Sequence, residues 1–237
     1  MNCIMLVGEG GSFMDGLIWL LILPGVVLGG MAQTWIRQAV ARYARQPVES
    51  RLTGAEVARY ILDSKGLSYV RIEPSKGVLS DHYDPRGKVL RLSEPVFAVR
   101  SVAAAGIAAH EAGHAIQDAE DYLPLEARSA IVPLVRAGSS VAPLVFFGGL
   151  LIASPTIMWI GAVMFGASTI FALITLPVEF DASRRALLHL ERLGILSEGV
   201  EMDGARKVLR AAAWTYVAAA VAAVGSWAMY LLLSRRR

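Results

Sequence analysis

The chain has 237 residues, of which 55% are hydrophobic and 18% charged, and its formal net charge at pH 7 is +3. Soluble domains average about 25% charged and 45–50% apolar residues, so this composition argues against an ordinary soluble protein. The single cysteine, Cys3, excludes an intramolecular disulfide and a thiolate metal cluster. The apolar excess lies in three uncharged runs, at residues 16–36, 137–178 and 211–234.

These runs predict an integral membrane protein that is mainly α-helical and has four transmembrane helices. About 20 apolar residues span a bilayer as a helix, and the middle run is long enough for two spans. Ser154-Pro155-Thr156 near its centre supplies the turn between them. The expected spans are residues 16–36, 137–153, 156–177 and 211–233.

The first span is expected to be an uncleaved anchor. A cleaved signal peptide has a basic start and an apolar core of about 7–15 residues. Here Glu9 and Asp15 precede the run, neither lysine nor arginine does, and the run is longer than such a core.

Lysine and arginine residues predict the orientation in the membrane. They lie beside the predicted spans, within the two polar segments at residues 37–136 and 178–210. The positive-inside rule therefore places both segments in the cytoplasm. The basic residues concerned are Arg37, Arg42, Arg45, Arg51, Arg128, Arg136, Arg184, Arg185, Arg206, Lys207 and Arg210. The tail residues Arg235, Arg236 and Arg237 oppose this orientation.

The segment between the first two spans has mixed, soluble character and predicts short helices and strands. Thr53 and Glu56 form a capping box that opens a helix, which ends near Ser64 and is closed by Gly66. Residues 69–72 then predict a short strand.

A β-hairpin is predicted next. Residues 78–83 and 88–92 flank Asp84-Pro85-Arg86-Gly87, in which Asp, Pro and Gly occupy the positions that a type I turn favours. We expect Leu90 and Leu92 on the covered face of this hairpin.

An alanine-rich segment from Ser101 to about Ala119 predicts a buried helix that carries His110-Glu111-Ala112-Gly113-His114. Residues i and i+4 lie on the same face of a helix, so both imidazoles can reach one metal ion. Zinc held by three protein ligands keeps a position for water and lowers the pKa of that water to about 7. Glu111 lies close enough to take a proton from it. The pattern therefore predicts a zinc-dependent metallopeptidase with Glu111 as general base.

The alternative is that both histidines are core residues with polar partners. It is disfavoured because half of the four histidines fall in one turn of an apolar helix. Burying them there without partners would cost several kcal/mol.

The third zinc ligand has more than one candidate. Asp118 shares the face of the histidines but lies about 6 Å further along the helix, and Asp121 qualifies only if the helix ends before it. Glu179 follows the third span, and two membrane crossings return the chain to the side it left. We favour Glu179, although Glu179 and Asp181 could instead be acids at a helix start, stabilised by the helix dipole.

Three segments carry a resemblance to a known family, namely residues 79–85, 109–117 and 177–183. They resemble the bacterial membrane family of neutral zinc metallopeptidases, the YugP-like proteins, from the first span to about residue 225. More distantly the chain is similar to the HtpX-like and CAAX-processing glutamate zincins, or gluzincins, which use H-E-x-x-H and a later E-F-x-A-D.

This resemblance implies a small α+β zincin-like (minigluzincin) catalytic domain in a bacterial plasma membrane. It also implies that Glu179 is the third ligand. Ser183 stands where the final aspartate of the family pattern would be, and Asp181 is expected to support a ligating histidine instead.

The resemblance further implies an edge strand beside the catalytic cleft, to which substrate could add as an extra strand. The hairpin at residues 78–92 is the natural candidate for that edge. His82 and Tyr83 near its turn could contact substrate, but we expect them to be surface turn residues. His189 could stabilise an oxyanion or be an ordinary helix residue.

The predicted organisation follows the spans. It comprises an N-terminal segment with the first span (1–36), a cytoplasmic catalytic region (37–136), a transmembrane hairpin (137–177), a cytoplasmic segment with the third ligand (178–210), and a last span with a basic tail (211–237). The expected partners are Zn²⁺, a peptide or protein substrate that includes membrane proteins, and the lipid bilayer, but no nucleic acid.

The sequence also bears on two other possible functions, a transporter and a zinc-binding scaffold, and on the oligomeric state. A transporter is disfavoured because the four predicted spans contain no Asp, Glu, Lys, Arg or His. A zinc-binding scaffold without peptidase activity would have no need of Glu111. The small-residue pairs Gly25 with Gly29 and Ala162 with Gly166 suit close helix packing or a homo-oligomer.

Overall fold

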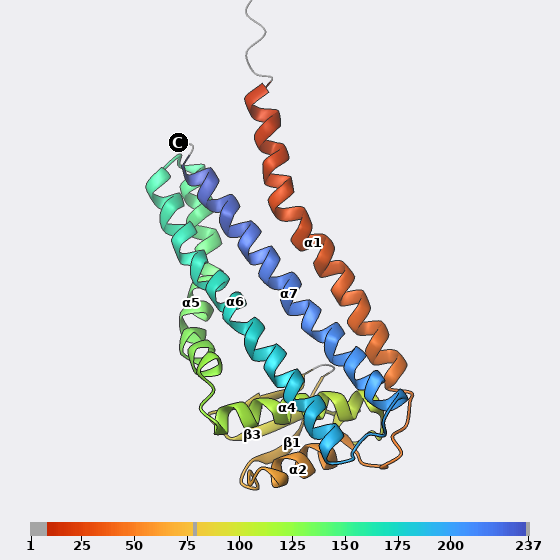
Figure 1. Ribbon diagram of the computed structural model, residues 1–237. Helices are drawn as coiled ribbons and strands as arrows, with labels where there is room; N and C mark the ends of the chain where they lie inside the picture. Colours follow the sequence, from red (N-terminus) through yellow and green to blue (C-terminus); the bar gives the residue numbers. More distant parts are fainter. Residues whose placement is uncertain (1–8, 78–79, 236–237) are drawn as a thin grey trace, which may run out of the picture. The chain divides into compact units, whose positions relative to one another are not determined.

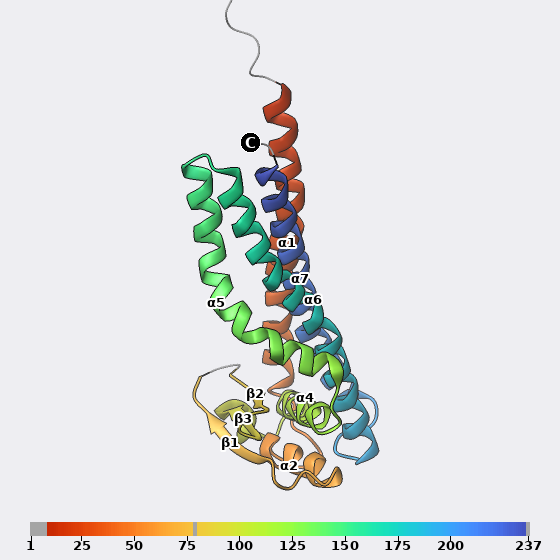
Figure 2. The same ribbon diagram turned by 90° about the vertical axis from the view of Figure 1, so that its left-hand side faces the viewer.

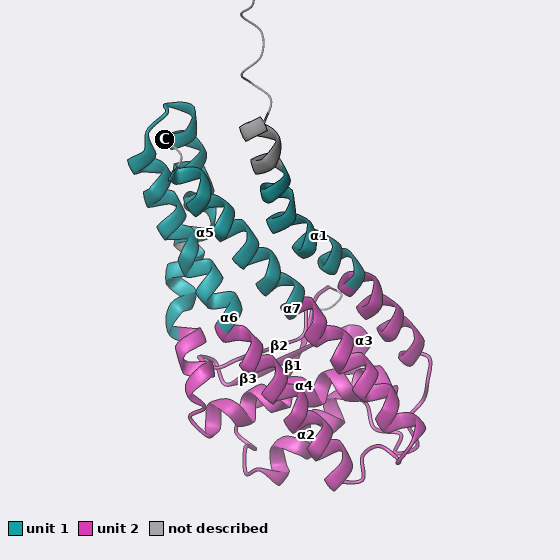
Figure 3. Cartoon of the chain, turned by 45° about the horizontal axis from the view of Figure 1, so that its top comes forward, with its two compact units in different colours: residues 1–31, 130–173, 217–237 teal, residues 32–129, 174–216 magenta. Residues whose placement is uncertain are grey.

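The computed structural model describes residues 9–77 and 80–235, apart from the side chains of residues 9–15 and 137. Several positions used above lie outside the described residues, namely Cys3, Val78, Leu79, Arg236 and Arg237. The chain forms two compact units, which Figure 3 distinguishes by colour. Unit 1 comprises residues 1–31, 130–173 and 217–237, and unit 2 comprises residues 32–129 and 174–216.

Long helices dominate the chain, as Figure 1 shows. Three described helices are long and apolar enough to cross a membrane, namely α1 (Glu9–Tyr43), α6 (Pro155–Arg192) and α7 (Val200–Ser234). A fourth, α5 (Leu123–Leu151), is bent by 47° between Leu123–Arg136 and Gly138–Leu151. Pro133 lies one turn before this bend, and proline interrupts helical hydrogen bonding. The described chain therefore has three candidate spans, or four if α5 counts as one, and the turn expected before α6 is present.

Unit 1 packs through small residues. A Cβ atom added to Gly25 on α1 would lie 2.5 Å from the Cα atom of Ala222 on α7, and one on Gly161 would lie 2.5 Å from the Phe146 nitrogen. Such close approach of backbones is typical of membrane helices. Gly25 and the buried Ala162 thus serve packing within the chain, and the homo-oligomer stays a prediction.

Unit 2 contains the short helices and strands that precede α5 in the sequence. In chain order they are α2 (Gly54–Ser64), β1 (Arg71–Ser75), β2 (His82–Asp84), β3 (Val89–Ser93), α3 (Glu94–Phe97) and α4 (Val102–Ala119). The strands form one sheet in the order β1-β3-β2, with β1 parallel and β2 antiparallel to β3. Figure 2 shows this sheet beside α4 and α2. Leu90 and Leu92 on β3 are fully buried, which confirms the covered face of the predicted hairpin.

The helix boundaries in unit 2 follow their caps. The amide of Glu56 donates to Thr53 Oγ1 at 3.2 Å, and the amide of Thr53 donates to Glu56 Oε2 at 2.7 Å, so the predicted capping box is confirmed. Ser101 Oγ caps α4 by accepting a hydrogen bond from the amide of Ala104. The strand expected at residues 69–72 begins only at Arg71, because the Val70 amide bonds to the Leu67 carbonyl in the turn after α2.

Candidate metal centre

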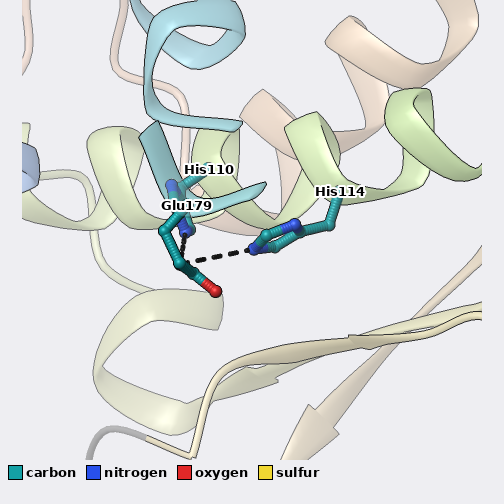
Figure 4. Close-up of side chains that lie close together, drawn as sticks. All are labelled: His110, His114 and Glu179. Atoms are coloured by element: carbon teal, nitrogen blue, oxygen red, sulfur yellow. Dashed lines mark hydrogen bonds and ion pairs between the residues drawn. The ribbon is translucent and has the colours of Figure 1, made fainter. Parts of the chain in front are cut away.

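Two imidazoles and one carboxylate meet between α4 and α6 in unit 2. His110 and His114 lie one turn apart on α4, and Glu179 comes from α6 (Figure 4). Oε2 of Glu179 lies 3.1 Å from Nε2 of His110 and 3.7 Å from Nε2 of His114. The three potential donor atoms all lie within 4.8 Å of one another, so one ion could contact all three.

This donor set suits zinc. Tetrahedral zinc with bonds of about 2.0–2.1 Å to nitrogen and oxygen holds its ligand atoms roughly 3.3–3.4 Å apart. The distances of 3.1 and 3.7 Å from Oε2 of Glu179 to the two Nε2 atoms lie on either side of this value. Two imidazoles with one carboxylate also leave a fourth position open, as in catalytic zinc sites. The ligand side chains are shielded from solvent, with 12%, 11% and 3% of the side-chain surface exposed for His110, His114 and Glu179.

The other candidates for the third ligand lie elsewhere. Asp118 Oδ2 accepts hydrogen bonds from the Tyr83 hydroxyl and from Lys88 Nζ, both at 2.6 Å. Asp121 is exposed in the loop after α4, and neither aspartate belongs to the group that could hold a metal. Asp118 instead connects α4 with the β2–β3 hairpin.

Close contact between two helices brings Glu179 to the histidines. A Cβ atom on Gly113 would lie 2.7 Å from the carbonyl oxygen of Ala182, so glycine allows α6 to touch the backbone of α4. Helix α6 continues through Pro177, and Glu179 and Asp181 therefore lie inside a helix. The alternative that both are acids at a helix start is wrong.

A buried glutamine orients His114. Gln117 is fully buried, and its Nε2 donates to the Val178 carbonyl and to Asp181 Oδ2, both at 2.9 Å. Its Oε1 atom must therefore face Nδ1 of His114, which lies at 2.9 Å. Nδ1 then carries the proton, which leaves Nε2 free to bind a metal.

The position that departs from the family pattern contacts the other histidine. Ser183 Oγ lies 3.2 Å from Nδ1 of His110, so serine supplies the outer contact at the place expected for aspartate. Asp181 forms ion pairs with Arg184 and Arg185 and reaches His114 only through Gln117. The expected direct support of a histidine by Asp181 is therefore wrong.

The charges around the centre are closely coupled. Burial alone would lower the pKa of His114, but the carboxylates of Glu179 and Glu111 raise it above its ordinary value. Arg128 Nη1 donates to Oε1 of Glu179 at 3.1 Å, and the Tyr216 hydroxyl on α7 also interacts with Glu179. Glu111 is buried with 8% of its surface exposed, close enough for its charge to act on His114.

Sequence reasoning missed three of these residues. Gln117 follows His114 by three residues on the same helix, and this spacing was a usable signal. In the sequence, Arg128 is only one of several basic residues beside the predicted spans, and Tyr216 lies in an apolar run without any marker of function. His82 is exposed, and its Nδ1 lies 2.8 Å from the Ser80 carbonyl, whereas His189 is buried on α6.

Comparisons with known proteins agree with this chemistry. Residues 18–235 match the family described as "Putative neutral zinc metallopeptidase". A protein of Bacillus subtilis (strain 168), named "Putative membrane protease YugP", is 46% identical over 201 residues, which cover 85% of this chain and 89% of that relative. No solved structure matches the chain significantly.

Proposed function

Since the chain belongs to this family of neutral zinc metallopeptidases, we propose that it hydrolyses peptide bonds with zinc held by His110, His114 and Glu179. Glu111 is the general base. The observation that carries the proposal is the convergence of the three donor atoms from α4 and α6 within 4.8 Å of one another. The proposed unit is a zincin-like domain of the gluzincin type, in which a glutamate is the third ligand.

In the proposed peptide hydrolysis, zinc and the protein side chains would have different roles. His110, His114 and Glu179 would hold zinc, which when bound would supply a Lewis acid able to polarise a carbonyl and to lower the pKa of water to about 7. Glu111 follows His110 directly on α4, so its carboxylate can take the proton of the attacking water and pass it to the leaving amine. Gln117 and Ser183 contact the Nδ1 atoms of the two imidazoles, which would leave both Nε2 atoms available to bind zinc.

The sheet offers a place for an extended substrate. Strand β2 lies at an edge of the sheet, because the strand order is β1-β3-β2, and it is linked to α4 through Tyr83 and Asp118. An extended peptide can add to such an edge through backbone hydrogen bonds. We propose that the substrate peptide lies along β2, where the exposed His82 contacts it.

We also propose that the site faces the cytoplasm of a bacterial cell and acts on membrane proteins or their juxtamembrane segments. The candidate spans and the membrane protease among the relatives support a membrane setting. The basic residues beside the spans support the cytoplasmic side.

The decisive variant is Glu111→Gln. A glutamine cannot accept the proton, so cleavage is expected to fall by about 10²–10⁴-fold while zinc stays bound. Purified protein in detergent is tested on a quenched fluorescent peptide library, and zinc is measured by elemental analysis. In parallel, membrane proteomes are compared between cells that hold the wild-type protein and cells that hold the variant.

Glu126→Gln is the matched control, because Glu126 is an exposed acid in the first turn of α5. It is expected to cut like the wild type, and removal of zinc by a chelator is expected to stop both proteins. If neither the wild type nor Glu111→Gln cuts any peptide or membrane protein although zinc is bound, the chain is a zinc-binding scaffold and the proposal fails.

A further inference from the structure

The two oxygens of the Glu179 carboxylate face different partners. Oε2 lies next to both imidazoles, whereas Oε1 accepts a hydrogen bond from Arg128 Nη1 at 3.1 Å. The Glu179 side chain is 3% exposed and that of Arg128 is 28% exposed, so the ion pair is largely shielded from water. The guanidinium thus occupies one oxygen and leaves the other for a metal.

The start of α5 determines where Arg128 points. Leu125 is buried, and its amide donates to the Tyr122 carbonyl at 2.8 Å, which fixes the first turn of the helix. Arg128 follows Leu125 by three residues, on nearly the same face of the helix. This anchored turn directs the guanidinium to a carboxylate 51 residues away in the sequence.

We propose that Arg128 is a positioning residue that holds Glu179 so that only Oε2 binds the zinc ion. This inference rests on the proposed function. Carboxylates bind metals through one oxygen or through both, and coordination by both would require Oε1 to turn away from the guanidinium. A charge-assisted hydrogen bond at 3.1 Å opposes that rotation.

Two effects of the guanidinium on zinc affinity have opposite signs. Its positive charge repels a dication, and removing it would therefore strengthen binding. Its hydrogen bond orients the ligand, and loss of such outer contacts weakens metal binding by about 10–100-fold. We expect positioning to dominate, because Oε1 is too deeply buried for water to replace the guanidinium fully.

The experiment measures metal binding by full-length protein in detergent. The variants are Arg128→Gln, Arg128→Lys, and Arg136→Gln as the control, since Arg136 is an exposed arginine on the same helix. Zinc affinity is measured by competition with a chromophoric chelator. The visible spectrum of the Co²⁺-substituted protein reports the coordination number, and thermal unfolding of the metal-free protein reports folding.

Arg128→Gln is expected to weaken zinc binding by about 10–100-fold and to change the Co²⁺ spectrum, with partial recovery in Arg128→Lys and wild-type values in Arg136→Gln. An unchanged or higher zinc affinity in folded Arg128→Gln, with a wild-type Co²⁺ spectrum, would overturn the inference. If Arg128→Gln does not fold, Arg128→Lys decides, because it keeps the charge but loses the planar fork and must still change the spectrum. If the wild-type protein binds no zinc, the proposed function itself fails.

Discussion

Two polar side chains, Gln117 and Ser183, contact the outer nitrogens of the two candidate histidine ligands. Gln117 is fully buried and satisfies His114, Asp181 and the Val178 carbonyl at once. Ser183 contacts His110 but is only partly buried. Water can replace the contact of Ser183 more easily than that of Gln117, because Ser183 is less buried. Loss of the Gln117 contact would leave a buried polar group unpaired, which costs about 1–3 kcal/mol.

This difference predicts an order of effects on zinc binding. Gln117→Leu leaves the buried Nδ1 of His114 without its acceptor and removes one of the two donors to Asp181 Oδ2, the other being Arg185, and we expect zinc affinity to fall by about 10–100-fold. Ser183→Ala should cost less, because water can reach Nδ1 of His110. Chelator competition measures both variants, and a larger loss in Ser183→Ala would contradict the order.

Asp118 shows why a shared helix face is not enough to identify a ligand. Its carboxylate is bound by Lys88 Nζ and by the hydroxyl of Tyr83. Burial and this hydrogen bond raise the pKa of Tyr83, so the phenol stays protonated and keeps donating at neutral pH. Asp118 therefore holds the hairpin to α4.

At the scale of elements, the site depends on the contact between α4 and α6. The glycine of the His110–His114 motif does not bind metal, but its missing side chain makes room for the Ala182 carbonyl of α6. Helix α6 runs unbroken from Pro155 to Arg192, so Glu179, Asp181 and Ser183 are presented together by one rigid element.

Gly113→Ala is therefore expected to destabilise the protein. Its Cβ atom would lie 2.7 Å from the Ala182 carbonyl oxygen, and relieving such a clash typically costs about 1–3 kcal/mol. The same shift would move Glu179 away from the histidines and weaken zinc binding. Thermal unfolding in detergent and chelator competition measure the two effects.

Gly106→Ala on the same helix is the matched control. Its Cβ atom would lie 3.6 Å from Ala205, which is an ordinary contact, and alanine favours a helix over glycine by about 1 kcal/mol. This control should be neutral or slightly stabilising. Equal destabilisation by both substitutions would show that the contact at Gly113 has no special role.

At the scale of the whole molecule, the membrane topology depends on the bent helix α5. The described chain has three candidate spans, or four if the bent helix α5 is one. In the four-span arrangement the loop between α5 and α6 and the polar segment that contains α2 lie on opposite sides. With only three spans, α5 would not cross and both would lie on the same side.

Cysteine labelling distinguishes these arrangements. In a Cys3→Ser background, Tyr60→Cys on α2 and Ile152→Cys after α5 place single thiols at positions that are 54% and 66% exposed. With a membrane-impermeant maleimide on intact cells, we expect labelling at position 152 and none at position 60 until the cells are opened. Labelling of position 60 from outside would refute the cytoplasmic site, and equal behaviour of both positions would refute the crossing by α5.

The sequence by itself determined what local physics controls. Apolar runs indicated membrane helices, Thr53 and Ser101 marked helix starts, and the spacing of His110 and His114 placed two imidazoles on one helical face. These features depend on residues within one or two helical turns of each other. They could be predicted because helical periodicity and capping do not depend on the rest of the chain.

Only the tertiary structure decided how the site is completed. The Glu179 contact to His110, the Arg128 ion pair and the Ser183 contact join residues 69, 51 and 73 positions apart. The two contacts to His110 exist because α6 touches α4 at Gly113, and Arg128 reaches Glu179 from the start of α5. No local pattern encodes where two helices meet. For the same reason the tertiary structure bound Asp118 to the hairpin and connected Asp181 to His114 through Gln117 rather than directly.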